Sequence, residues 1–165
     1  MATIKIIYGS TTGNTESAAN DIASALSAHT VESVDVGSAS KEDFESSDLL
    51  ILGTSTWGVG DLQDDWESGI DTLKSADLSG KKVALFGCGD ADSYCDTFVD
   101  GMGIIFEALS EMGATIIGKT SSEGYSHTDS RADIEGEFVG LALDDNANDN
   151  DSKMSSWVES INSQL

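Results

Sequence analysis

Four hydroxyl side chains and two glycines stand together at positions 9–15, which read GSTTGNT. The stretch follows the apolar run IKII, so it stands where a strand would lead into a helix. Such a loop presents several backbone N–H groups, and the helix N-terminus adds a partial positive charge of about half a unit. It could therefore hold a phosphate through amides and hydroxyls, without a lysine or arginine. The alternative is an ordinary turn with a capping side chain.

The glycine spacing separates this loop from the common nucleotide-binding motifs. A P-loop needs four residues between its glycines and then Gly-Lys-Ser/Thr, whereas here three residues separate Gly9 and Gly13, and Asn14 replaces the lysine. The spacing is not G-x-G-x-x-G either. The pattern therefore favours an anion-binding turn that is unlike that of a nucleotide hydrolase.

A second polar loop, TSTWGVGDL at positions 54–62, follows the apolar run LLILG. Trp57 stands among hydroxyl residues and glycines beyond a strand end, so its ring could stack on a flat ligand. Gly58 and Gly60 would let the backbone approach that ligand closely. The alternative is a tryptophan that only anchors its own loop.

A third loop, GCGDADSYCD at positions 87–96, follows the apolar run KVALF and supplies a second aromatic side chain, Tyr94. Asp90, Asp92 and Asp96 raise the question of a metal. The acidic part of this loop, DADSYCD at positions 90–96, lacks the glycine and the terminal glutamate of a calcium loop, so we predict no metal site. Together the three loops describe one pocket, with a phosphate cradle and two aromatic rings for a planar group.

Apolar periodicity places these loops in an alternating series of strands and helices. The expected strands are Ala2–Tyr8, Val31–Val36, Leu49–Gly53, Lys82–Gly87 and Ala114–Gly118. The expected helices are Asn14–His29, a short helix capped by Ser40 and running through Glu45, Trp66–Leu73, Thr97–Met112 with Gly113 as its C-cap, and Ser152–Ser163. Five such units predict an α/β fold, one domain over residues 1–165 with a parallel sheet between helices. Its ligands bind at the carboxyl ends of the strands, where the three loops lie.

One segment breaks the alternation. Residues 120–150 are polar and rich in turn residues but contain the apolar run FVGLAL. We expect an excursion that interrupts the fifth strand, with Glu137–Leu143 returning to the sheet. The excursion could be a partner surface or a tolerated insertion. The acidic run from Asp144 to Asp151 is expected to be a solvated connection before the last helix.

The charge is strongly acidic, with 8 basic and 30 acidic residues and a formal net charge of −22. This charge repels nucleic acid and anionic membranes and attracts basic protein surfaces. Adaptation to a salty cytoplasm is the alternative reason for it. No apolar run is long enough to span a membrane and no signal peptide is evident, so we expect a cytoplasmic protein. Cys88 and Cys95 are expected to be free thiols.

The three loops resemble those of the flavodoxin family. The matching motifs are STTGNT at 10–15, TSTWGVGDLQDDW at 54–66 and FGCGDADSYCDTFVD at 86–100. The likeness continues through EGY at 123–125, FVGLALD at 138–144 and WV at 157–158, so it covers essentially the whole chain. The expected excursion within the fifth strand resembles the insertion of the long-chain subgroup of this family.

The resemblance implies a three-layer α/β/α fold, a five-stranded sheet in the order 2-1-3-4-5 and one non-covalent FMN. It assigns the phosphate to Ser10, Thr11, Thr12, Gly13, Asn14 and Thr15, and places Thr54, Ser55 and Thr56 near the phosphate and ribityl chain. Trp57 would cover the inner flavin face and Tyr94 the outer face. Cys88, Gly89, Asp90 and Asp96 would meet the pyrimidine edge, and the Gly58–Val59 peptide would flip toward flavin N5. Two departures from the family are Gly58–Val59, where many members carry a larger polar residue, and Cys88, often leucine.

The resemblance also implies a low-potential, monomeric one-electron carrier that is not an enzyme. It would cycle mainly between neutral semiquinone and anionic hydroquinone, and nearby acids would disfavour the anion. Its partners would be basic redox proteins, such as ferredoxin-type NADP reductases and photosystem or nitrogenase components.

Two other functions remain as alternatives. A flavin-dependent quinone or NAD(P)H oxidoreductase on the same fold would need room for a substrate over the flavin, which Trp57 and Tyr94 would occupy. A receiver-type signalling domain would need an acidic pair after the first strand and an aspartate after the third. Tyr8-Gly9 and Gly53-Thr54 stand there instead.

Overall fold

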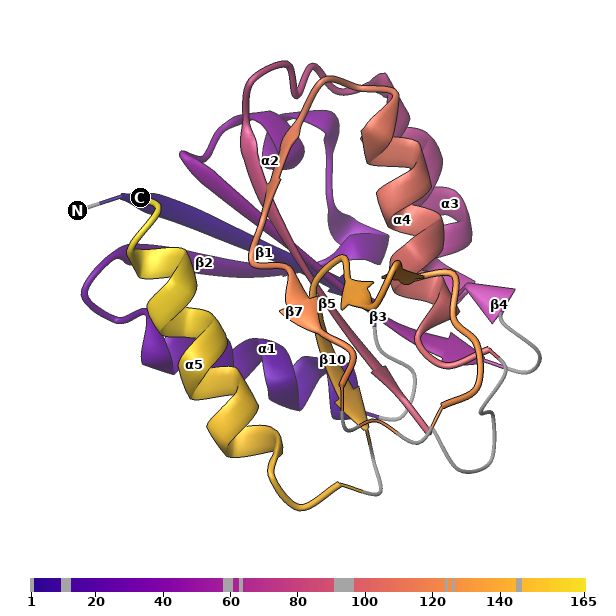
Figure 1. Cartoon of the computed structure of the whole chain (residues 1–165). Helices are drawn as coiled ribbons and strands as arrows, with labels where there is room; N and C mark the ends of the chain where they lie inside the picture. The colour runs from indigo at the N-terminus through magenta and orange to yellow at the C-terminus, as the bar shows by residue number, and fades with distance from the viewer. Residues whose placement is uncertain are drawn as a thin grey trace.

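A parallel β-sheet forms the centre of the fold (Figure 1). The structure is a computed structural model that describes residues 2–9, 13–57, 61–62, 64–90, 97–123, 125, 127–144 and 147–165, with only the backbone for residues 57, 61 and 62. The sheet runs in the order β2 (Thr30–Asp35), β1 (Thr3–Gly9), β3 (Leu49–Trp57), β5 (Lys82–Gly89) and β10 (Leu141–Asp144). Two further strands join it: β6 (Thr115–Ile117) beside β5, and β4 (Asp61–Leu62) antiparallel to β3.

This arrangement confirms the predicted strand order 2-1-3-4-5. Strand β5 is the fourth strand, and β6 and β10 are the two halves of the fifth. Both halves pair in parallel with β5: Ala84 lies opposite Ile117, and Phe86 lies opposite Leu141. The expected interruption of the fifth strand is therefore present.

Helices cover both faces of the sheet (Figure 1). Helices α2 (Lys41–Glu45), α3 (Asp64–Ser75) and α4 (Asp100–Ser110) pack on one face, and α1 (Asn14–Ala25) and α5 (Asn150–Asn162) pack on the other. A 3-10 helix, η1 (Val36–Ser38), follows β2. Strand β3 is buried on both sides, because alternate side chains point to opposite faces: Leu50 and Leu52 join the α3–α4 core, and Leu49 and Ile51 join the α1–α5 core.

The short helix α2 begins as its sequence predicted. The Ser40 N–H donates a 2.8 Å hydrogen bond to Asp43 Oδ2, so the third helical residue reaches back to the cap. Phe44 on its inner side is buried, and its ring lies 6.3 Å from that of Trp66 on α3. Of the helices the structure describes, none is long and apolar enough to cross a bilayer.

The return of the excursion to the sheet differs from the prediction. Residues Glu137–Phe138 form β9, which pairs with β7 (Thr120–Ser121) and β8 (Asp133–Ile134) in a separate antiparallel sheet, and only Leu141–Asp144 rejoins β5. Phe138 is buried among other aromatic rings, and the chain then passes so close to β5 that a Cβ on Gly140 would stand 2.1 Å from the Leu85 carbonyl oxygen. Packing of Phe138 among these rings therefore keeps residues 137–138 out of the main sheet, and pairing with β5 starts at Leu141.

The ends of several helices and strands also differ from the predicted ones. Helix α1 stops at Ala25 rather than His29, and α4 spans 100–110 rather than 97–112. Strands β3 and β5 continue to Trp57 and Gly89, beyond the apolar runs that predicted them, because the backbone ladder carries on through polar and small residues.

Candidate functional site

The carboxyl ends of four strands meet at one edge of the sheet. Gly9 lies opposite Thr54, Ser55 lies opposite Cys88, and Asp144 lies opposite Gly89. The loops that the sequence singled out after the first, third and fourth strands therefore begin side by side. This is the edge at which parallel α/β sheets bind their ligands.

The first loop leads into α1 through a left-handed residue. Gly13 has φ 94°, a conformation that glycine adopts without strain, and its carbonyl oxygen accepts a 2.9 Å hydrogen bond from the Ser17 N–H. Asn14 and Thr15 form the first turn of the helix. Ser10, Thr11 and Thr12 lie outside the described residues.

The hydroxyl of Thr15, in the first turn of α1, is buried and makes no hydrogen bond to another described residue. The residue is 1% exposed, and within the described part of the chain its Oγ1 atom has no hydrogen-bond partner. A buried hydroxyl without a partner costs about 1–3 kcal/mol, so native structures rarely keep one. Its position at a helix N-terminus, after a glycine turn, makes it a donor suited to an anion.

The second loop begins with three hydroxyl residues at the end of β3. Thr54 is fully buried, and its Oγ1 donates a 3.0 Å hydrogen bond to the Ser55 carbonyl oxygen. Thr56 Oγ1 accepts a 2.8 Å hydrogen bond from the Gly101 N–H of α4. The backbone of Trp57 pairs with that of Asp61 in β4, while the Trp57 side chain, Gly58 and Val59 lie outside the described residues.

The third loop, positions 87–96, starts within β5, whose last two residues are Cys88 and Gly89. Cys88 carries a thiol, as expected, and is 5% exposed; Cys95 lies outside the described residues. A Cβ on Gly89 would stand 3.2 Å from the Phe98 ring, so the strand end lies tightly under the start of α4. Asp90 follows directly, partly exposed; Tyr94 and Asp96 lie outside the described residues.

Asp144 is a feature that the sequence analysis missed. It was expected in a solvated connection, but it ends β10 and is only 7% exposed. Its carbonyl oxygen accepts hydrogen bonds from the Asn150 side chain at 2.9 Å and the Ala147 N–H at 3.0 Å. The apolar run before it was the available signal, because the ladder with β5 extends one residue past that run.

Negative charge gathers at this end of the sheet. Asp64, Asp65 and Glu67 occupy the first turn of α3. Burial raises the pKa of the Tyr8 hydroxyl at the end of β1, and the charges of Glu16 and Asp35 raise it further. Among the described residues, no group of three or more His, Cys, Asp or Glu side chains is arranged to hold a metal ion.

Comparison with known proteins gives one consistent relationship. A family model described as flavodoxin matches residues 6–157. The chain is 43% identical over 170 aligned positions to a flavodoxin of Trichodesmium erythraeum (strain IMS101), covering 100% of this chain and 99% of that protein. It is 39% identical over 168 positions to a flavodoxin of Klebsiella pneumoniae, covering 100% and 96%.

The fold comparison agrees with the sequence comparison. A crystal structure of Fusobacterium nucleatum flavodoxin bound to flavin mononucleotide matches with a TM-score of 0.93 and 28% identity, covering 100% of this chain and 99% of that one. Sequence, strand order and the converging loops thus lead to the same conclusion. The chain belongs to the flavodoxin family, whose members are electron-transfer flavoproteins and not enzymes.

Proposed function

We propose that this chain binds one molecule of FMN non-covalently and carries single electrons between redox proteins. Family membership supports the proposal, as does the FMN found in the Fusobacterium relative. The observation in this chain that carries it is the buried, unpartnered Thr15 hydroxyl in the first turn of α1. FMN would bring a terminal phosphate to that turn, and the phosphate oxygens would satisfy the hydroxyl.

The phosphate would be held by Ser10, Thr11, Thr12, Gly13, Asn14 and Thr15. Their backbone N–H groups, hydroxyls and one amide are donors suited to a dianion, and the N-terminus of α1 adds favourable electrostatics. The negative charge of Glu16, in the same turn, would repel the phosphate and weaken this electrostatic attraction. The hydroxyls and amides would therefore provide most of the binding free energy.

The ribityl chain and ring would lie across the ends of β3 and β5. Thr54, Ser55 and Thr56 would serve the ribityl side, Trp57 and Tyr94 would cover the two ring faces, and Cys88, Gly89, Asp90 and Asp96 would meet the pyrimidine edge. Gly58 and Val59 would provide the peptide beside flavin N5. Convergence of the described members at one sheet edge supports this assignment.

Bound FMN supplies one-electron redox chemistry, and the protein tunes its potential. We propose cycling mainly between the neutral semiquinone and the anionic hydroquinone. The acids in the first turn of α3 lie beside the strand ends and would disfavour the anion, which keeps the potential low.

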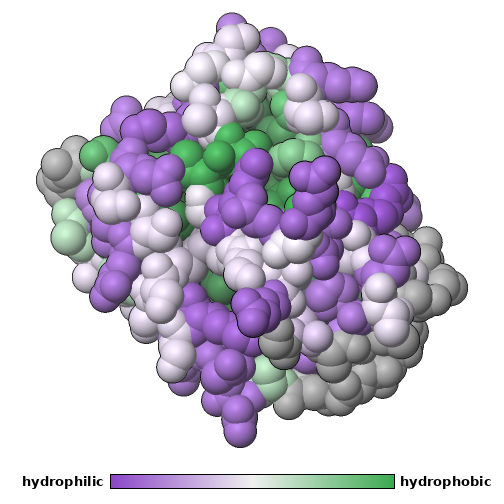
Figure 2. Space-filling view, in the orientation of Figure 1, coloured by the Kyte–Doolittle hydropathy of each residue, from purple (hydrophilic) through white to green (hydrophobic). Residues whose placement is uncertain are grey.

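The acidic surface suits basic redox partners. Hydrophilic side chains are spread over the face seen in Figure 2, around an apolar patch in its upper half, and the chain carries a net charge of −22. Long-range attraction would speed association with basic proteins and weaken in salt. Ferredoxin-type NADP reductases and photosystem or nitrogenase components are the partner class we propose, for a monomeric carrier in the cytoplasm.

The decisive experiment is titration of the apoprotein with FMN, followed by stepwise reduction of the complex. We expect one FMN per chain and two separate one-electron steps in the absorption spectrum. Absence of FMN binding would overturn the proposal. Steady NAD(P)H oxidation by the isolated complex would instead favour an oxidoreductase on this fold.

A further inference from the structure

We propose that the groove between α5 and β7 is a second binding site, for a small aromatic molecule that carries a single carboxylate. The inference goes beyond the proposed FMN function and does not depend on it, because the groove is lined by residues outside the three loops. Its volume is about 420 Å³, within the usual range for small-molecule sites.

Helix α5 supplies a wall of small polar side chains to the groove. Ser152, Ser156 and Ser160 recur at every fourth position, so they lie along one line of the helix, and all three are exposed. Their short side chains leave space that a longer side chain would fill. Their hydroxyls are donors suited to an anion.

The groove is apolar and aromatic at its base. Trp157 and Leu141 are 2% and 1% exposed, and they line the groove together with Tyr125. The polar atoms of both aromatic side chains are already bonded: the Trp157 indole N–H donates to the Gly118 carbonyl oxygen at 2.8 Å, and the Tyr125 hydroxyl donates to the Ala142 carbonyl oxygen at 2.7 Å. These side chains therefore offer a ligand apolar surface, which suits an aromatic ring.

The charges of the groove differ from those of the rest of the chain. Acidic residues outnumber basic ones 30 to 8 overall, yet the described residues that line the groove include two lysines, Lys119 and Lys153, and one carboxylate, Glu123. Lys119 is exposed and forms no ion pair with any described residue; its ammonium lies 5.9 Å from the centre of the Phe106 ring. An unpaired ammonium beside an apolar groove attracts a carboxylate.

The second lysine is held beside the groove by an aromatic ring. The Lys153 ammonium lies 4.0 Å from the centre of the Tyr125 ring and 3.2 Å from Asp149 Oδ1, one turn earlier on α5. Asp149 is largely exposed, and exposed ion pairs are weak, so this pair leaves the ammonium available to a ligand. The contact with the ring fixes its position.

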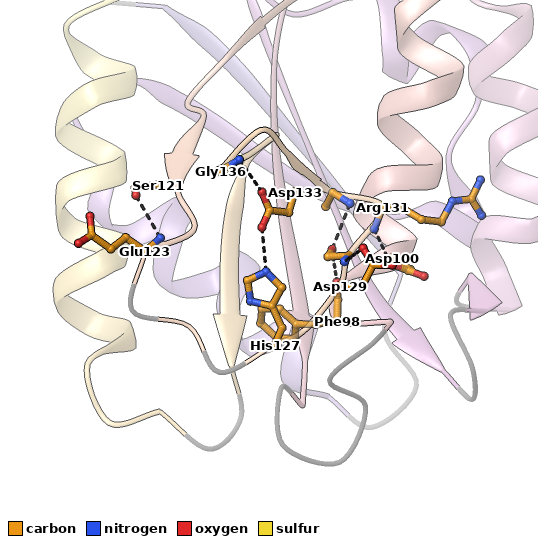
Figure 3. A network of polar contacts seen from close by, with 11 residues as sticks. Phe98, Asp100, Ser121, Glu123, His127, Asp129, Arg131, Asp133 and Gly136 are labelled. Carbon is orange, nitrogen blue, oxygen red and sulfur yellow. Dashed lines mark hydrogen bonds and ion pairs between the residues drawn. The ribbon is translucent and has the colours of Figure 1, made fainter.

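Glu123 limits the charge that the groove accepts. Its N–H donates a 3.1 Å hydrogen bond to the Ser121 hydroxyl, and Figure 3 shows its side chain directed toward α5. The two lysines exceed this carboxylate by one positive charge, which matches a monoanion. A dianion would be repelled more strongly by Glu123, so the structure favours a single carboxylate on the ligand.

The test titrates 2-naphthoate into the chain saturated with FMN and follows the tryptophan indole N–H signals by NMR. The Trp157 signal should shift, with a Kd below about 1 mM that rises as salt is increased. The signal of Trp66, which bonds to Gly53 at the FMN end of the sheet, should stay in place. The amide 2-naphthamide has the same shape without the charge and should bind about tenfold more weakly.

Charge variants test the recognition of the carboxylate. Lys119→Gln and Lys153→Gln should each raise the 2-naphthoate Kd about fivefold, and Glu123→Gln should lower it about threefold. Lys74→Gln is the matched control, because it removes the same charge from the last turn of α3, outside the groove, and should leave the Kd unchanged.

A size variant tests the location. Ser156→Leu should fill the groove and prevent binding. Ser155→Leu makes the same change at an exposed position of α5 that does not line the groove, and it should leave binding intact. If Ser156→Leu does not fold, the charge variants carry the test.

Three results would overturn the inference. They are equal affinity for 2-naphthoate and 2-naphthamide, a shift of the Trp66 signal in place of that of Trp157, and equal effects of Lys74→Gln and Lys119→Gln. The same titration without FMN separates the inference from the proposed function. If the chain fails to bind FMN, the Trp157 signal and its dependence on Lys119 still decide whether the groove binds the carboxylate.

Discussion

The indole N–H of Trp66 donates a 2.8 Å hydrogen bond to the carbonyl oxygen of Gly53, the residue directly before Thr54. Trp66 lies in the first turns of α3 and is fully buried. The bond fixes the helix with the acidic first turn against the strand that leads into the second loop. This one hydrogen bond therefore contributes both to the stability of the fold and to the geometry of the site.

Trp66→Phe should lower the free energy of unfolding by about 1–3 kcal/mol, because the Gly53 carbonyl loses a buried partner and the smaller ring leaves space. FMN Kd should rise as well. Trp157→Phe is the matched control: Trp157 donates a 2.8 Å bond to the Gly118 carbonyl oxygen, away from the site. Urea denaturation and FMN titration of both variants check this, and equal effects on FMN Kd would contradict it.

Gly53→Ala should destabilise the chain by about 1–3 kcal/mol or more, because the new Cβ would stand 2.0 Å from the Phe86 ring. The clash is specific to that ring, so the cost should shrink when Phe86→Leu is present in the same chain. A double-mutant cycle by urea denaturation measures the coupling, expected at about 0.5–3 kcal/mol. Additive effects would show that the ring is not what the methyl group meets.

Thr15→Val should change stability and FMN affinity in opposite directions. Valine keeps the shape but removes a buried hydroxyl without a partner, so the apoprotein should gain about 1 kcal/mol. FMN Kd should rise about tenfold, because the phosphate loses a donor. Thr15→Ser keeps the donor and should retain the affinity. Tight FMN binding by the valine variant would remove Thr15 from the phosphate site.

Acid should weaken the contact between α2 and β1. The Ser40 N–H and the Lys5 ammonium, 3.1 Å from Asp43 Oδ1, hold the pKa of Asp43 below its ordinary value of 3.8, although burial opposes them. A carboxylate with a lowered folded pKa stabilises the fold above its ordinary pKa and loses that contribution as the pH falls through the lowered value.

Asp43→Asn isolates this contribution from the general neutralisation of the acidic surface. At pH 6 the unchanged chain should exceed the variant by about 1 kcal/mol in free energy of unfolding, and the gap should close toward pH 3. Urea denaturation across that range measures it. A gap that stays constant with pH would show that the Asp43 charge contributes nothing.

The sequence predicted the central strands because buried parallel strands are continuous apolar runs with few other interpretations, and the resemblance to the flavodoxin family supplied the strand order. The sequence also predicted the α2 cap, since serine is a preferred residue at a helix N-cap. The loops were found at the right sheet edge because each follows such a run.

Tertiary contacts decided what the sequence analysis missed. Phe138 belongs to an apolar run that predicts a sheet strand, but its ring packs with Phe98 and so joins the excursion instead. The left-handed Val99 has no local signal, because its residue type disfavours that conformation. Burial of Asp144 came from a ladder that continued beyond the apolar residues.

The register of the divided fifth strand has a consequence for chain length. Ile117 faces Ala84 and Leu141 faces Phe86, so a single residue opposite Leu85 would complete an uninterrupted strand. A shortened chain with one residue between Ile117 and Leu141 would keep every rung on both sides of that point. It would lose Ser130 and Arg131 together with everything else between the two halves. The sheet itself therefore sets no minimum length for the segment, and what a shortened chain would give up are contacts outside the sheet, such as those of Ser130 with Phe98 and of Arg131 with Asp100.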